Sequence, residues 1–156
     1  MYIIDVRTQK HFDVEITSIE PQDFKEITKK KYFFNWKLEK DFEIYKVTKV
    51  DDSKILGLVS IERIPEEWRI HIRLLSVSAV NKGKQKLYER IVGNMLTFIS
   101  KLAIKEFAEL ACVSLKPKSS IAQHYIETYG MNITGVTLSL ELAEIINLIE
   151  KYDNGK

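Results

Sequence analysis

The segment that most constrains the fold places a strand, a polar loop and a long helix in succession. Residues 68–78 have the apolar pattern of a strand, and residues 81–86 contain no acidic side chain. From Leu87 to about Lys105, apolar residues recur at spacings of three and four, as they do on one face of an α-helix. The sequence therefore predicts a strand over 68–78, a loop over 81–86 and a helix over 87–105.

The predicted strand changes phase near its end. Ile70, Ile72 and Leu74 place apolar side chains at every second position, on one face of the strand. Leu75 and Val77 are apolar at the positions of the opposite face. A β-bulge produces such a change because one extra residue exchanges the two faces of a strand. A strand that is buried on both faces produces the same pattern, so the sequence leaves both alternatives open.

The other elements form a mixed pattern around this segment. Alternating apolar residues come first. After the long helix follow a short apolar strand, a helix that Gly130 ends, an extended stretch that Gly135 interrupts, and an amphipathic helix. The other expected strands cover 2–7, 11–19, 42–50, 55–64, 110–115 and 131–140, and the other expected helices cover 23–31, 119–129 and 141–152. This order predicts an α+β fold with a mixed, mostly antiparallel central sheet flanked by helices.

Composition and charge exclude several classes of protein. The chain has 156 residues, which predicts a single domain over 1–156. Its 24 basic and 22 acidic residues leave a net charge of +2, so no nucleic-acid partner is expected. Asp5 interrupts the first apolar residues, and no apolar run approaches about 18 residues. A cytoplasmic protein without a membrane partner is therefore expected.

The motifs of several enzyme classes are absent from the sequence. It contains neither the glycine-rich P-loop nor the Gly-x-Ser-x-Gly turn of hydrolases. One cysteine and three histidines make a structural zinc site unexpected. The cysteine, Cys112, lies in a short apolar run and is interpreted as a buried, inert thiol. If the protein is an enzyme, its chemistry should need neither a protein nucleophile nor a metal.

The loop between the strand and the long helix has the composition of an anion site. Lys82, Lys84 and Lys86 supply positive charge, and Gly83 allows the backbone to approach a ligand closely. A helix start favours an anion because its N–H groups lack partners within the helix. The loop therefore suits a pyrophosphate, and a solvated lysine-rich turn remains the alternative.

Two stretches resemble a known family. Residues 77–88 and 124–130, together with the predicted strand pair before the loop, resemble the GNAT superfamily of N-acetyltransferases, and within it a small, divergent bacterial branch. The resemblance covers roughly residues 42–140. It implies the GNAT acyl-CoA N-acyltransferase fold, acetyl-CoA as cosubstrate without a metal, and a small-molecule or peptide amine as acceptor; a homodimer is compatible with it.

The resemblance also implies roles for individual residues. Leu75 and Val77 should offer backbone groups to the pantetheine arm, in a slot where the sheet splays between 75–77 and 110–115. Tyr125 should protonate the leaving thiolate, and His71 occupies the strand that often carries the base. The expected contacts of the pyrophosphate are Asn81, Lys82, Gly83, Lys84, Gln85 and Lys86. The structural alternative for Tyr125 is aromatic packing. The alternative for His71 is a position on the strand without a catalytic role.

Two other functions remain open. The family loop follows Gln/Arg-x-x-Gly-x-Gly/Ala, and alignment from Asn81 puts Lys84 and Lys86 at the glycine positions. This departure, and a strand without the usual glutamate, favour a degenerate GNAT-fold protein that serves as a CoA-binding or interaction module. A nucleic-acid accessory role for the basic and aromatic stretch 29–36 is a third reading, which the even charge balance opposes.

Overall fold

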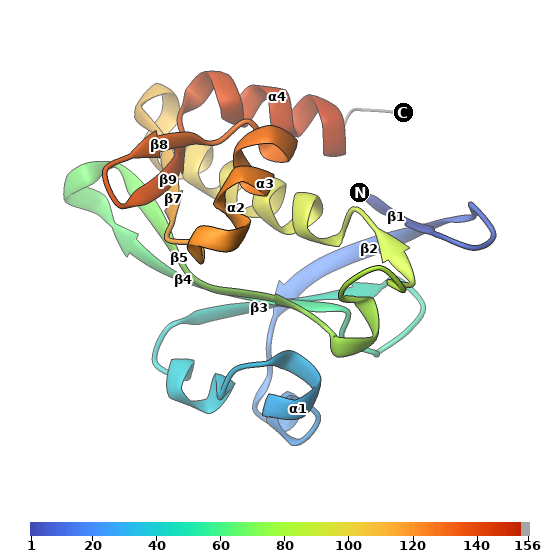
Figure 1. The fold of residues 1–156 in the computed structure, drawn as a ribbon. Helices are drawn as coiled ribbons and strands as arrows, with labels where there is room; N and C mark the ends of the chain where they lie inside the picture. Colours follow the sequence, from blue (N-terminus) through green and yellow to red (C-terminus); the bar gives the residue numbers. More distant parts are fainter. Residues whose placement is uncertain (154–156) are drawn as a thin grey trace. The chain divides into compact units, whose positions relative to one another are not determined.

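The computed structural model describes residues 1–153, and its chain divides into two compact units (Figure 1). The first unit comprises Met1–Ser60 and Leu74–Met95, and the second comprises Ile61–Arg73 and Leu96–Lys156. Strands β4 (Gly57–Ile64) and β5 (Arg69–Val77) and helix α2 (Ile91–Phe107) each contribute residues to both units. The single domain over 1–156 stays a prediction.

The described strands form one nine-stranded sheet in the order β6-β1-β2-β3-β4-β5-β7-β9-β8. Besides β4 and β5, the sheet contains β1 (Tyr2–Asp5), β2 (His11–Ser18), β3 (Glu43–Lys49), β6 (Tyr88–Glu89), β7 (Cys112–Leu115), β8 (Asn132–Thr134) and β9 (Thr137–Leu140). β5 and β7 are parallel, whereas β1–β2, β2–β3 and β7–β9 are antiparallel. The predicted α+β fold with a mixed sheet is confirmed.

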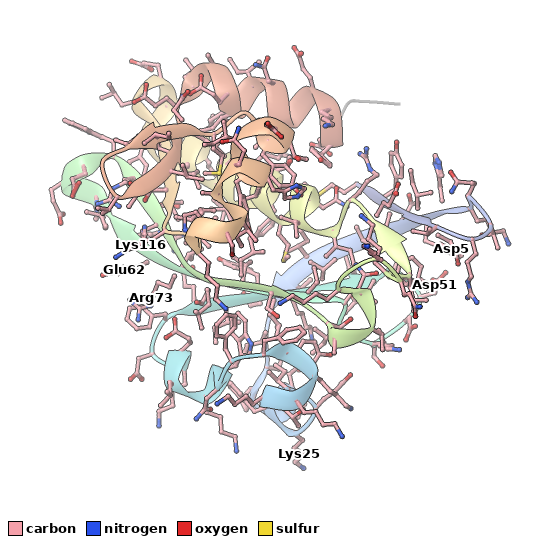
Figure 2. All side chains as sticks on the ribbon, in the orientation of Figure 1. Asp5, Lys25, Asp51, Glu62, Arg73 and Lys116 are labelled. Atoms are coloured by element: carbon pink, nitrogen blue, oxygen red, sulfur yellow. The ribbon has the colours of Figure 1, made fainter. Side chains whose placement is uncertain are left out.

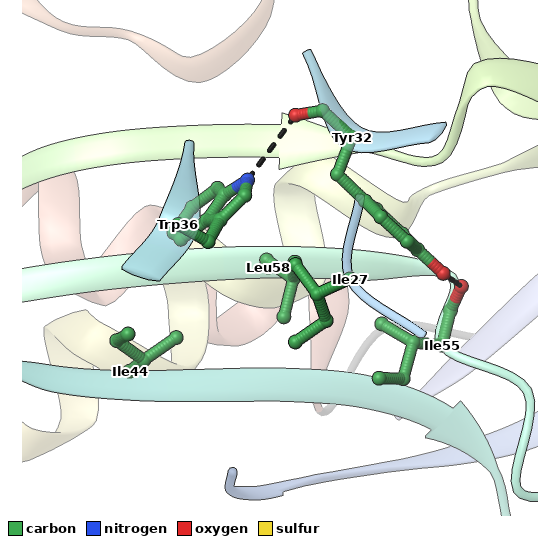
Figure 3. Packing of buried hydrophobic residues seen from close by; sticks show 6 residues of the cluster. All are labelled: Ile27, Tyr32, Trp36, Ile44, Ile55 and Leu58. Carbon is green, nitrogen blue, oxygen red and sulfur yellow. Dashed lines mark hydrogen bonds between the residues drawn. The ribbon is translucent and has the colours of Figure 1, made fainter. Parts of the chain in front are cut away.

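The core of the first unit gathers around a tyrosine and a tryptophan (Figure 3). Tyr32 and Trp36 are almost fully buried against Ile44, Ile55 and Leu58. The Tyr32 hydroxyl donates to the carbonyl of Ile55 at 2.9 Å, and the Trp36 indole N–H donates to the carbonyl of Tyr32 at 3.2 Å. Both polar groups therefore have partners inside an otherwise apolar cluster.

The predicted helix over 23–31 is wrong, because the chain forms two short turns there instead. A 3₁₀ turn covers Pro21–Lys25, and helix α1 covers Lys29–Tyr32. Between them Thr28 has extended backbone, and its hydroxyl accepts from the N–H of Lys31, which starts a new helix. The other 3₁₀ turns are Trp36–Glu39, Pro65–Glu67, Ala79–Asn81 and Ala108–Leu110.

The second unit contains helices α3 (Ser119–Tyr129) and α4 (Leu142–Tyr152). The predicted bounds of α3 are confirmed, and the helix ends because Gly130 adopts a left-handed conformation with φ of 71°. The predicted stretch 131–140 is extended and interrupted at Gly135, as the sequence indicates. Gly135, with φ of 64°, turns it into the antiparallel hairpin β8–β9.

Within residues 1–153, no helix is long and apolar enough to cross a membrane.

Candidate functional site

Asn81 closes the lysine-rich loop. The residue is 6% exposed, its side-chain N–H donates to the carbonyl of Tyr88 at 3.0 Å, and its amide oxygen accepts from the N–H of Tyr88 at 2.6 Å. The side chain thus joins the two ends of the loop and satisfies both polar groups of the Tyr88 backbone. The backbone N–H of Asn81 is also engaged, because it donates to the carbonyl of Ser78 at 2.9 Å, and the expected contact of Asn81 with a ligand stays a prediction.

The three loop lysines differ in their surroundings. Lys82, Lys84, Gln85 and Lys86 are all exposed, and the Lys82 ammonium also lies over the ring of Phe33, 4.3 Å from its centre. Gly83 has φ of 84°, a conformation that favours glycine, and a side chain there would meet no atom within 4 Å. The loop therefore presents all three lysines to solvent, and Lys82 also makes a cation–π contact.

The predicted start of the long helix at Leu87 is wrong. Tyr88 and Glu89 form the short strand β6, which pairs with Asp5 and Ile4 of β1. Arg90 then has φ of 84°, and α2 begins at Ile91. Pairing with β1 extends the chain, and the left-handed residue marks the change of direction into the helix. β6 therefore separates the lysine loop from the helix start.

Arg90 and Asn94 attach the beginning of α2 to β1. Arg90 Nε donates to the carbonyl of Tyr2 at 3.3 Å, and its guanidinium carbon lies 4.0 Å from the centre of the Tyr2 ring. Asn94 Nδ2 donates to the same carbonyl at 2.9 Å. The guanidinium adds positive charge to a helix terminus that already carries the positive end of the helix dipole. This end of α2 is therefore a second candidate location for an anion.

Leu75 and Val77 lie beyond the part of β5 that pairs with β7. Parallel pairing with β7 runs from Arg69 to Ile72 in β5, and it uses all four residues of β7. Ser76 is buried, whereas Leu75 and Val77 are partly exposed. Their backbone contact with a pantetheine arm, and the slot expected there, stay predictions.

His71 belongs to a hydrogen-bonded group on β5 and β7. Ser114 is its partner in the parallel register, and the Ser114 hydroxyl lies 2.8 Å from His71 Nδ1. Arg69 Nη1 donates to the same hydroxyl at 2.8 Å. Burial lowers the pKa of His71 below its ordinary value, and the Arg69 guanidinium lowers it further. His71 is therefore uncharged at neutral pH.

Two glutamates accompany the arginines of this strand. Arg69 Nη2 lies 2.9 Å from Glu67. Arg73 Nη1 lies 3.3 Å from Glu62, and Figure 2 labels both of these residues. The glutamate side chains are 55% and 43% exposed, respectively, so these are surface ion pairs that contribute little to stability. They partly balance the positive charge around His71.

Tyr125 is buried in an aromatic group on α3. Its side chain is 9% exposed, and its ring centre lies 5.6 Å from that of Tyr129 and 6.2 Å from that of His124. Burial raises the pKa of the Tyr125 phenol above its ordinary value, so the phenol stays protonated at neutral pH. Aromatic packing is thus observed for Tyr125, and its role as an acid stays a prediction.

Cys112 is half-buried at the start of β7, and burial raises the pKa of its thiol. A thiol in this environment is a poor nucleophile at neutral pH. Across residues 1–153 there is no group of three or more His, Cys, Asp or Glu side chains that could hold a metal ion.

Comparison with known proteins identifies the fold. No protein-family model matches the sequence, and no curated protein matches it. The ribosomal-protein-S18-alanine N-acetyltransferase from Escherichia coli superposes with a TM-score of 0.63 at 13% identity, over 83% of this chain and 94% of that one. A GNAT family acetyltransferase from Elizabethkingia anophelis, solved with acetyl-CoA bound, gives 0.60 at 14% identity, over 83% and 98%.

A mutant spermidine/spermine N-acetyltransferase from Vibrio cholerae also superposes, with a TM-score of 0.60 at 12% identity, over 86% of this chain and 98% of that chain. All three neighbours are covered almost over their full length, so the similarity includes the complete acetyltransferase fold and not one supersecondary motif. The chain therefore has the fold of the GNAT acetyltransferases.

Proposed function

We propose that the protein is an acetyl-CoA-dependent N-acetyltransferase that transfers an acetyl group to a primary amine. The observation that carries the proposal is the succession of β5, a lysine-bearing loop and the start of α2, within a fold whose solved examples include one with acetyl-CoA bound. Lys84, Lys86 and Arg90 bring positive charge to this part of the first unit. The CoA diphosphate is the anion that they would bind.

The observed helix start offers a second alignment of the family loop pattern Gln/Arg-x-x-Gly-x-Gly/Ala. Counted from Arg90, the arginine and Gly93 fall on the first and fourth positions, and Met95 occupies the last. This match places the pattern at the observed start of α2 at Ile91, whereas the sequence predicts a helix from Leu87. We therefore add Arg90 and Gly93 to the proposed contacts of the cosubstrate, beside the loop residues 81–86 and the backbone of 75–77.

The proposed reaction is a direct attack of the amine on the thioester. The amine nitrogen forms a bond to the acetyl carbon, the carbon–sulfur bond breaks, and a base or a chain of water molecules takes the ammonium proton. The departing thiolate gains a proton, for which Tyr125 is the proposed donor because burial keeps its phenol protonated. His71, for which the family resemblance implies the role of the base, is the proposed residue near the attacking amine.

The proposed acceptor is a primary amine of a small molecule or a peptide. The names of two structural neighbours state different acceptors. One is an alanine of a ribosomal protein, and the other is the pair of polyamines spermidine and spermine. The fold therefore accommodates both kinds of amine and does not choose between them. We propose no narrower class on this ground.

A degenerate GNAT-fold module is the second candidate function. It is favoured by the lysines at the glycine positions of the first alignment and by a β5 strand without a glutamate. Such a protein would bind CoA weakly or not at all and would serve as an interaction module. It differs from the enzyme in one measurable respect, because it releases no thiol from acetyl-CoA.

Thiol release from acetyl-CoA with a panel of amines tests the proposal. The panel contains polyamines, free amino acids and short peptides with unmodified N-termini. We expect at least one amine to raise thiol release well above the rate without amine, and mass spectrometry to find the acetylated amine. Binding of acetyl-CoA without turnover of any amine would favour the module, and the absence of binding would reject both acetyl transfer and CoA binding.

A further inference from the structure

We propose that Ser114 and Arg69 hold neutral His71 in the tautomer that carries its proton on Nε2, so that His71 offers a hydrogen-bond donor to the molecule it faces. The proposal deepens the proposed function, because it changes the role of a proposed site residue from proton acceptor to binding group. The hydrogen-bond geometry that carries it lies entirely within the second unit.

The strand register brings the three side chains together. β5 and β7 are parallel, and His71 lies directly opposite Ser114. Arg69 precedes His71 by two residues, so both side chains project from the same face of β5. The Ser114 hydroxyl lies 2.8 Å from His71 Nδ1 and 2.8 Å from Arg69 Nη1. One buried hydroxyl, 2% exposed as a residue, thus contacts both neighbours.

The direction of each hydrogen bond follows from counting protons. A guanidinium has only donors, so Arg69 must donate to the Ser114 oxygen. The hydroxyl retains its own hydrogen, and His71 Nδ1 is the acceptor within reach. When Nδ1 accepts, the single ring proton of a neutral histidine resides on Nε2.

The opposite tautomer would leave a buried donor without an acceptor. If Nδ1 carried the proton, the Ser114 oxygen would accept from both His71 and Arg69, and its own hydrogen would have to turn elsewhere. Among the described residues, Ser114 Oγ has hydrogen bonds only to Arg69 and His71. A buried donor without a partner costs free energy, so the Nε2–H tautomer is favoured.

Burial and the two neighbouring arginines together oppose a positive charge on the ring. Arg69 and Arg73 disfavour a protonated imidazole and Glu62 favours it, while burial gives the largest contribution against the charge. Glu67 is the ion-pair partner of Arg69. Cys112, whose thiol has a raised pKa, lies opposite Arg69 in the register of β5 and β7. His71 is therefore neutral near pH 7, and in the proposed tautomer Nε2 cannot take a proton from an ammonium group.

His71 would consequently bind an acceptor atom, such as a carbonyl or hydroxyl oxygen of the amine-bearing molecule, through Nε2–H. The proton of the attacking amine would leave by another route, through water or another side chain. This conclusion replaces the base role that the family resemblance implies for His71, and it leaves the proposed acetyl transfer itself unchanged.

Nitrogen-15 spectroscopy of the imidazole rings tests the tautomer without any assay of activity. The chain has only three histidines, so His11 and His124 serve as internal references, and His71→Gln assigns the third signal. At pH 8 we expect the His71 ring to show a protonated Nε2 and an Nδ1 resonance displaced by an accepted hydrogen bond. A proton on Nδ1 in the wild-type protein would overturn the proposal.

Two serine variants complete the test. Ser114→Ala should return the Nδ1 resonance of His71 toward the position of an unbonded nitrogen, and Ser114→Thr, which keeps the hydroxyl, should not. Ser139→Ala is the matched control, because Ser139 is also buried, lies opposite Ser114 in β9 and hydrogen-bonds with Thr134. An Nδ1 resonance that Ser114→Ala leaves unmoved, or that Ser139→Ala moves equally, would contradict the proposal whether or not the protein transfers acetyl groups.

Discussion

The side chain of Asn81 binds the backbone of Tyr88 at both of its polar groups, at 3.0 Å to the carbonyl and 2.6 Å to the N–H. Asn81→Ala removes both hydrogen bonds from a partly buried site, so we expect the free energy of unfolding to fall by about 1–3 kcal/mol. Urea unfolding measures the loss. Gln85→Ala, which removes an exposed amide of the same loop, should change stability by less than about 0.5 kcal/mol. Equal stability of the two variants would show that Asn81 does not close the loop.

Replacement of Lys82, Lys84 and Lys86 by glutamate should abolish CoA binding, because the loop would repel the diphosphate. Titration calorimetry measures the affinity, and added salt should weaken the wild-type interaction because the contacts are partly exposed. The control converts Lys29, Lys30 and Lys31 of α1 to glutamate, with the same change of charge within the first unit. If both triple variants bind CoA as the wild type does, the loop is not the phosphate site.

Tyr125→Phe should lower the turnover of acetyl-CoA by about 10²–10⁴-fold, as expected when a general acid is lost. The ring and its contacts with Tyr129 remain, so the fold and the CoA affinity should change little. Tyr129→Phe is the matched control, since it removes a phenol hydroxyl from the same helix and the same aromatic group. Unchanged turnover in Tyr125→Phe would remove this residue from the mechanism.

Tyr32 should make stability depend on alkaline pH. Burial, and to a smaller extent Glu26, raises the pKa of its phenol to about 12. Because the folded pKa lies above the unfolded value of about 10, this contribution is complete below pH 10 and is lost as the pH rises toward 12. Tyr32→Phe should cost about 1–3 kcal/mol at pH 7, because it leaves the Ile55 carbonyl without its donor.

The difference in unfolding free energy between wild type and Tyr32→Phe should therefore shrink between about pH 10 and pH 12. Other tyrosines titrate equally in both proteins, so the difference isolates Tyr32. A difference that stays constant over this range would contradict the assigned pKa shift.

Local signals in the sequence predicted much of the fold. Gly130 ends α3 at the predicted residue because glycine adopts the left-handed conformation without a steric cost. The alternation in residues 11–19 placed β2 within one residue, since only one register buries its apolar face. These elements depend on residue types that determine the backbone within a few positions.

Features that depend on distant partners could not be predicted. β6 exists because Tyr88 and Glu89 pair with β1, more than eighty residues away in the chain. The left-handed backbone of Arg90 has no signal in its residue type, so the predicted helix began too early. The hydrogen bond between His71 and Ser114 depends in the same way on the register of β5 and β7, which no local pattern encodes.

Thermal unfolding in the presence of acetyl-CoA tests the central claim most directly. A ligand that binds only the native state at about 100 times its dissociation constant adds about 2.7 kcal/mol of stability. For a chain of this size that corresponds to a rise in Tm of roughly 5–11 °C. Pantetheine, which lacks the diphosphate, should raise Tm much less. A rise that saturates with acetyl-CoA and is lost in the Lys82, Lys84 and Lys86 triple variant is the predicted result, and an unchanged Tm at millimolar acetyl-CoA would contradict the account.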